Sequence, residues 1–130
     1  ANAFHALSLR LVTSGTAEQA LLNAETATKL YHELVALAPR HLPTLASSLR
    51  NVGSILWAVG RRDEAISACE EAVGIMRKLV NSETYFLPDL AEALDQLADY
   101  LAEKGDVGVA AAVGDECAEV RREFAALPPE

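Results

Sequence analysis

A regular series of carboxylates is the part of this sequence best suited to binding chemistry. In segment 87–104 the acidic residues recur every three or four positions, which places them on one face of a helix. They are Glu92, Asp95, Asp99 and Glu103, and Gln96 lies beside them. Like charges stacked in this way oppose helix formation by roughly a few tenths of a kcal/mol per pair. A basic partner segment would relieve that repulsion, whereas without a partner the carboxylates would form a solvated face.

A second polar set lies about 45 residues earlier, in segment 42–59. It consists of Arg50, Asn51, Ser54 and Trp57. If the two segments lie side by side, we expect Arg50 to pair with Asp95 or Glu92 of the neighbouring helix. The only tryptophan, Trp57, lies at the edge of its helix's apolar stripe. It is suited either to anchoring a partner or to filling the core between structural units.

Neither catalysis nor metal binding is indicated by the spacing of the reactive residues. His5, His32 and His41 lack the spacing of metal ligands, and no phosphate loop, nucleophile elbow or HExxH motif occurs. Two cysteines, Cys69 and Cys117, are too few and too widely separated for a disulfide framework or a CxxC motif. We therefore expect packed, reduced thiols and a protein that is not an enzyme, with no metal and no cofactor.

The overall charge narrows the class of partner. A chain of 130 residues with a formal charge of -8 and a pI near 4.8 lacks the clustered Lys and Arg that bind nucleic acid or an anionic membrane surface. No apolar run is long enough to span a bilayer, and no signal peptide is evident. We expect a cytoplasmic protein. Because the chain starts without Met and ends in Pro128-Pro129-Glu130, we also expect a fragment of a longer protein.

The elements that must position these residues repeat with a period of 45 residues. A shift of 45 pairs Leu49 with Leu94 and Gly60 with Gly105, and the reverse shift pairs Gly60 with Gly15. A fixed period of this length is typical of a repeat protein, in which each unit buries its apolar face against its neighbours. The predicted copies form a single array over 1–130 and span about 1–41, 42–86 and 87–127.

Each copy is predicted to form two amphipathic helices joined at a glycine, which tolerates the left-handed conformation just past a helix end. We expect Thr44 and Asp89 to cap the first helices of the second and third copies. The result is an all-α fold, a right-handed superhelical stack of three antiparallel helix pairs. Small residues such as Gly53 and Ala65 fall where two helices of one copy should touch.

The last helix, from about Val107, differs from its counterpart in the second copy. Gly108 and Gly114 each cost roughly 1 kcal/mol of helix propensity relative to Ala. In addition, Arg121 stands where the second copy has Met76. We expect one side of this helix to face solvent and the helix to fray first.

These features resemble a tetratricopeptide repeat. Gly53 and Ala65, 12 positions apart, and Ala72 in the second helix lie where that family places its signature. The segments 60–65 and 87–91 are similar to a long-period variety found in tandem in actinobacterial and fungal signalling proteins. The resemblance implies an α-solenoid whose first helices line a concave groove.

Two functions follow from this resemblance. The first is a protein-protein interaction module that holds a basic or mixed peptide segment in its groove. The second is a structural spacer or self-oligomerisation element of a larger signalling or sensor protein, acting through exposed end helices. Some family members hold a peptide's terminal carboxylate with a pair similar to Arg50-Asn51, but the accompanying basic residues are absent from the third copy. The expected partner-binding residues are Arg50, Asn51, Ser54, Trp57, Glu92, Asp95, Gln96, Asp99 and Glu103.

Overall fold

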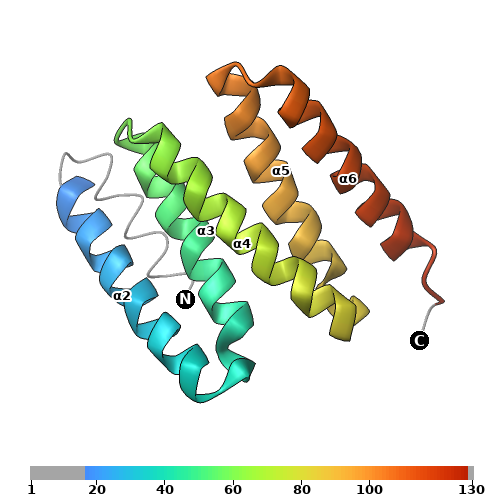
Figure 1. The fold of residues 1–130 in the computed structure, drawn as a ribbon, viewed down its shortest axis with the longest axis horizontal. Coiled ribbons are helices and arrows are strands. Elements are labelled where there is room, and N and C mark those ends of the chain that lie inside the picture. Colours follow the sequence, from blue (N-terminus) through green and yellow to red (C-terminus); the bar gives the residue numbers. More distant parts are fainter. Residues whose placement is uncertain (1–16, 129–130) are drawn as a thin grey trace.

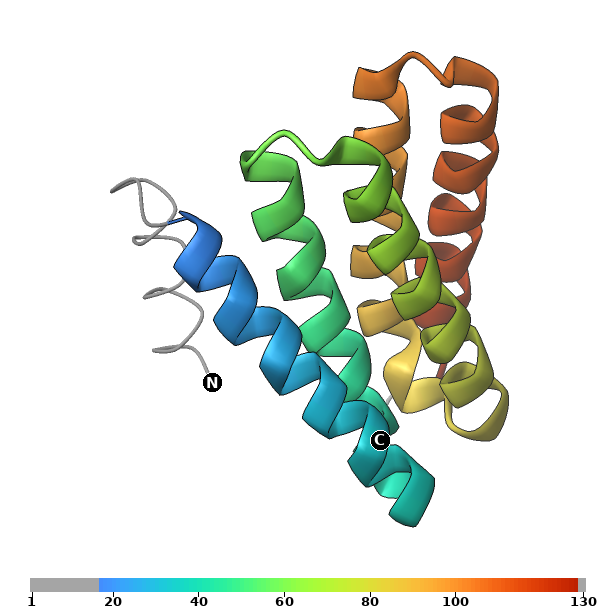
Figure 2. The same ribbon diagram turned by 60° about the vertical axis from the view of Figure 1, so that its left-hand side comes forward.

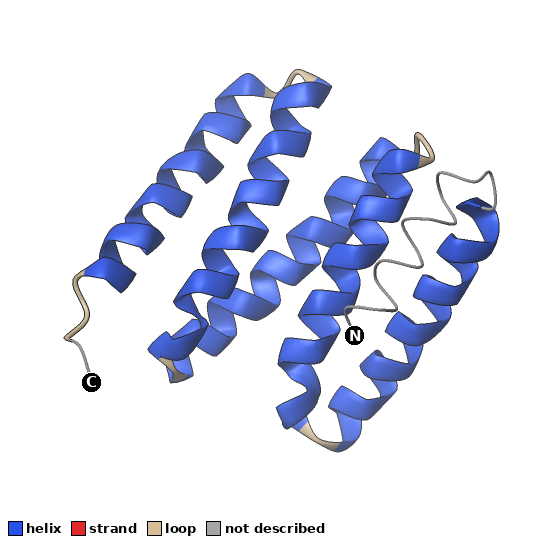
Figure 3. Ribbon diagram, turned by 180° about the vertical axis from the view of Figure 1, so that it is seen from behind, coloured by secondary structure: helices blue, strands red, loops and turns tan. Residues whose placement is uncertain are grey.

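The computed structural model describes residues 17–128, and every regular element among them is helical (Figures 1 and 3). The predicted first helix of the first copy lies outside the described residues. The α-helices are α2 (Ala17–Leu37), α3 (Leu42–Ala58), α4 (Arg62–Ser82), α5 (Leu87–Lys104) and α6 (Val107–Ala125). Two short 3-10 helices, η1 (Pro39–His41) and η2 (Thr84–Phe86), connect α2 to α3 and α4 to α5.

The helices stack in chain order and form a solenoid (Figure 2). The hairpins α3–α4 and α5–α6 pack most extensively, α2 packs on α3, and α4 packs on α5. As a result α3 and α5, the first helices of successive predicted copies, run in the same direction (Figure 1). The all-α, repeat-like fold predicted from the 45-residue period is confirmed.

The two hairpins turn at glycines that lie 45 residues apart. Gly60 and Gly105 have φ angles of 89° and 103°, the left-handed region that glycine adopts without strain. The amide of the following residue then bonds back across the turn: Arg61 N donates to Leu56 O, and Asp106 N donates to Leu101 O, each at 2.9 Å. This is the Schellman arrangement, which satisfies carbonyls at the helix end.

The predicted N-caps are wrong in both described copies. Helices α3 and α5 begin at Leu42 and Leu87, so that Thr44 and Asp89 lie inside the first turn. The reason is proline. Pro43 and Pro88 occupy the second position of each helix, where the fixed φ angle suits a helix and no backbone N–H is needed. Each proline is therefore a helix residue and lies one position before the N-cap that the sequence predicted.

The core is built where the helices of one copy meet and where the copies meet. Gly53 lies at the α3–α4 crossing, and a Cβ there would come within 2.9 Å of Cys69 Sγ and 3.3 Å of Ala65 O. The predicted close approach of Gly53 and Ala65 is thus confirmed.

Both cysteines are buried and unpaired, and burial raises the pKa of the Cys69 thiol to about 12. Such a thiol is a poor nucleophile at neutral pH.

Candidate partner-binding groove

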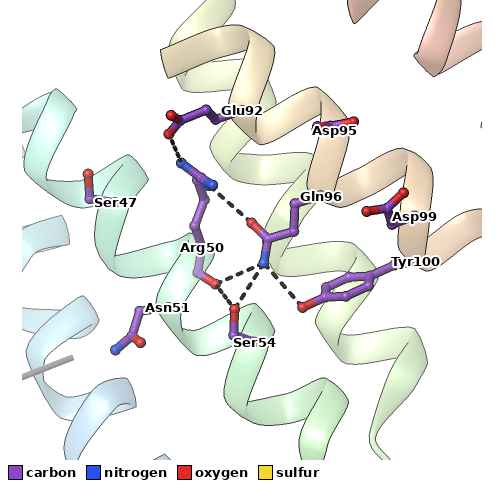
Figure 4. A pocket seen from close by; sticks show the side chains of 9 residues that line it. All are labelled: Ser47, Arg50, Asn51, Ser54, Glu92, Asp95, Gln96, Asp99 and Tyr100. Atoms are coloured by element: carbon purple, nitrogen blue, oxygen red, sulfur yellow. Dashed lines mark hydrogen bonds and ion pairs between the residues drawn. The ribbon is translucent and has the colours of Figure 1, made fainter. Parts of the chain in front are cut away.

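A groove of about 710 Å³ lies between α3 and α5 (Figure 4). Because these helices are neighbouring and parallel, polar residues at spacings of three and four on each form facing walls. The lining residues are Ser47, Arg50, Asn51 and Ser54 from α3, and Glu92, Asp95, Gln96, Asp99 and Tyr100 from α5. Seven of the nine predicted binding residues are in this set, and the other two, Trp57 and Glu103, are not.

Gln96 connects the two walls of the groove. Arg50 Nε donates to Gln96 Oε1 at 3.0 Å, and Gln96 Nε2 lies 3.1 Å from Ser54 Oγ and 3.2 Å from the Arg50 carbonyl. It also lies 3.3 Å from the hydroxyl of Tyr100 on its own helix. The amide oxygen of Gln96 therefore accepts a hydrogen bond from α3, and the amide nitrogen donates to α3. Together these bonds fix the orientation of the amide and the position of Arg50 (Figure 4).

The charges of the groove are partly paired. Arg50 Nη1 lies 3.4 Å from Glu92 Oε2, so the lateral pair predicted for Arg50 forms with Glu92. Asp95 Oδ2 lies 3.5 Å from Arg121 Nη2 of α6. Over residues 17–128 no basic side chain lies within 4 Å of the carboxylate of Asp99 or of Glu103. The carboxylates that the sequence presents as one series are thus electrostatically unequal.

Trp57 lies between copies, next to the groove. Its indole stacks on the Tyr100 ring, with centroids 4.2 Å apart and planes 4° from parallel. The Arg62 guanidinium carbon lies 4.6 Å from the indole centroid. Two groups this close to one ring must occupy opposite faces, so both faces of the indole are covered. The structure thereby gives Trp57 the packing role that was one of the two alternatives at the sequence level.

Two lining residues, Ser47 and Tyr100, are not among the nine predicted binding residues, and Tyr100 is the one that contacts other groove side chains. It is partly buried, lines the groove and supports both Gln96 and Trp57. Its position four residues after Gln96 places it on the same helix face, and that spacing was the available signal. Glu103 lies a further turn along the helix, exposed and outside the lining.

Metal-ligand clusters and membrane-spanning helices are both absent from the part of the chain that the structure describes. Within residues 17–128 no three His, Cys, Asp or Glu side chains come together in a way that could hold a metal ion. None of the described helices combines the length and the apolar character that crossing a membrane would require.

Comparison with known proteins agrees with this architecture. Residues 45–84 match a family model described as a tetratricopeptide repeat. The match runs from the first turn of α3 through α4 to the first residue of η2 and so covers most of one helical hairpin. None of the curated proteins compared with the chain is significantly similar to it. The helical stack and the match together support a protein of the tetratricopeptide type, a class that generally mediates protein-protein interactions.

Proposed function

We propose that the groove between α3 and α5 binds a linear segment of a partner protein that carries lysine or arginine side chains. The observation that supports this most strongly is the distribution of charge. Three carboxylates of α5 and a single guanidinium from α3 line one groove, in a chain whose formal charge is -8. A segment of opposite charge is attracted to such a surface and like-charged segments are repelled.

The composition of the groove sets the expected character of binding. Its lining is polar, with Tyr100 as the only aromatic side chain among the lining residues. Hydrogen bonds and exposed charges contribute more to association rate and specificity than to affinity. We therefore expect modest affinity that falls as salt screens the charges, over a Debye length of about 8 Å at physiological ionic strength.

A charge-reversal experiment tests the proposal. The probe is a fluorescently labelled octapeptide of alternating lysine and serine, with its glutamate-serine counterpart as the negative control. Fluorescence anisotropy should show that the wild-type chain binds the lysine peptide and that Asp95→Lys combined with Asp99→Lys abolishes binding. The matched control is Asp115→Lys with Glu119→Lys, an exposed pair on α6 with the same spacing and the same change of charge.

The control should retain most of the binding, because its residues do not line the groove. Binding that survives the groove reversal unchanged would refute the proposal. Failure of the wild-type chain to bind the lysine peptide, or equal loss in the two double variants, would refute it as well.

A second candidate function is self-association through the end of the array. A pocket of about 240 Å³ is lined by Leu87, Pro88, Ala91, Glu92, Arg121 and Phe124. Its counterparts one period earlier include Leu42 and Met76, which pack in the core of the stack. A second copy of the chain could cover this end in the way that the third copy covers the second.

Light scattering over a wide concentration range tests this second function. Self-association predicts an average mass that rises with concentration, and Phe124→Glu should abolish the rise. Phe124 is 48% exposed, so the substitution should leave the fold intact. A mass that stays monomeric at all concentrations would exclude self-association of this chain.

The number of copies in the array and its location in the cell are further parts of the proposal. On the strength of the 45-residue period, we propose three copies at about 1–41, 42–86 and 87–127, of the long-period variety found in signalling proteins. We further propose that the array works in the cytoplasm. Fractionation of cells that express the tagged full-length protein tests the location.

A further inference from the structure

The distribution of ion pairs along α5 gives the groove two unlike ends. This inference rests on the proposed function, since it concerns which part of the same groove binds the partner's charged side chain. We infer that the end around Asp99 and Tyr100 takes the partner's cationic side chain, and that the end around Glu92 does not. The position of the partner's cationic side chain along the groove would then be fixed.

Pairing within the protein neutralises the Glu92 end. Glu92 lies 3.4 Å from the Arg50 guanidinium, and the hydrogen bond from Arg50 to Gln96 keeps that guanidinium in place. One turn further along α5, Asp95 lies 3.5 Å from Arg121. A cation from a partner would have to compete with a resident guanidinium at either position.

The Asp99 end keeps its negative charge. The basic residues at the end of α5 and at the start of α4 have other partners. Lys104 Nζ lies 2.7 Å from Asp63, Arg62 stacks on Trp57, and Arg61 forms a bidentate pair with Glu64. Among the described residues none of these cations lies within 4 Å of Asp99. The carboxylate therefore faces the groove without a resident counter-ion from this part of the chain.

Tyr100 gives this end a second feature suited to a long cationic side chain. It lines the groove next to Asp99 and is only partly buried. Lysine and arginine lay their aliphatic stems along apolar surface while the charged group reaches a polar partner. An aromatic ring beside an unpaired carboxylate offers both contacts.

The two ends are far enough apart to act separately. Glu92 and Asp99 are seven residues apart on one helix, which is about 10 Å along its axis. At 0.15 M salt the Debye length is about 8 Å. Removing a charge at one end therefore has a reduced effect on a cation bound at the other.

A pair of neutralising substitutions tests whether the two ends of the groove differ. Asp99→Asn and Glu92→Gln each remove one exposed carboxylate from the groove wall, so both variants should fold. With the lysine-serine octapeptide at 0.15 M salt, Asp99→Asn should weaken binding by about fivefold and Glu92→Gln by less than about twofold. Equal losses, or a larger loss for Glu92→Gln, would overturn the inference.

A second pair of variants tests the role of the α6 arginine. Arg121→Ala frees Asp95 and should tighten peptide binding more than Arg122→Ala, which removes the same charge from an exposed neighbour on α6. Equal effects would contradict neutralisation of Asp95. If the Asp95→Lys and Asp99→Lys reversal abolishes binding while these comparisons fail, the assignment of the cation to the Asp99 end is wrong but the groove still binds its partner. If the reversal has no effect, the proposed function itself is wrong.

Discussion

Helices α4 and α6 hold the same place in successive copies but differ sharply in burial. Helix α4 buries Ala65, Ile66, Ala68, Cys69, Ala72, Val73, Ile75 and Met76. Helix α6 buries Ala110, Cys117 and Val120. Over the described residues, α4 packs on both α3 and α5, whereas the extensive packing of α6 is on α5 (Figure 2).

The difference shows that the neighbours of a helix, and not its repeat pattern alone, decide which residues must be apolar. Where α4 has the buried Met76 and Cys69, α6 has the exposed Arg121 and the half-buried Gly114. Arg121 instead forms an ion pair with Asp95 beside the groove. Because Arg121 is not needed in the core, it is available to pair with a carboxylate of the candidate site.

The largest effect is expected from truncating Met76 and Arg121, which occupy the same position in α4 and α6. Met76 is 3% exposed and part of the main core, so Met76→Ala should lower the free energy of unfolding by about 2–5 kcal/mol. Arg121→Ala should cost less than about 1 kcal/mol, because its ion pair is exposed. Urea unfolding followed by circular dichroism measures both, and similar losses would contradict the proposed difference in packing.

A smaller effect is expected at the close helix crossing. Gly53→Val places side-chain atoms against Cys69 Sγ and the Ala65 carbonyl, and overpacking of this kind costs about 1–3 kcal/mol. The matched control is Gly74→Val in α4, where a Cβ would meet no atom within 4 Å. The same unfolding experiment should show a clear loss for Gly53 and none for Gly74. An unchanged midpoint for Gly53→Val would show that the crossing is looser than described.

The smallest effect should be a gain of stability. A Cβ on Gly114 of α6 would meet no atom within 4 Å, so Gly114→Ala should stabilise the protein by about 0.5–1 kcal/mol through helix propensity. Thermal unfolding should show a higher midpoint. A lower midpoint would mean that α6 is packed as tightly at Gly114 as α4 is at Cys69. That result would contradict the difference in burial between the two helices.

Much of the fold could be predicted because it depends on local, repeated signals. Gly60 and Gly105 determine where two of the helices end. The helical spacing of the apolar residues determines which faces are buried. The same periodicity brought seven of the nine predicted residues to one groove. The helix starts were misplaced because a proline can belong either to a connection or to the first turn.

The details of the groove could not be predicted, since they depend on distances between helices. Sequence spacing shows that Asp95 and Asp99 share a face, but only the packing of α6 on α5 brings Arg121 to Asp95 and leaves Asp99 without such a partner among the described residues. The role of Tyr100 likewise depends on the position of Trp57 in the neighbouring copy.

The most direct test of the central claim is to map the binding surface by NMR. The ¹⁵N-labelled chain would be titrated with the lysine-serine octapeptide while backbone amide shifts are followed. The groove account predicts that the largest changes fall in residues 47–54 of α3 and 92–100 of α5, with little change in 107–120 of α6. Changes centred on α6 or on α2, or no changes at all, would contradict it.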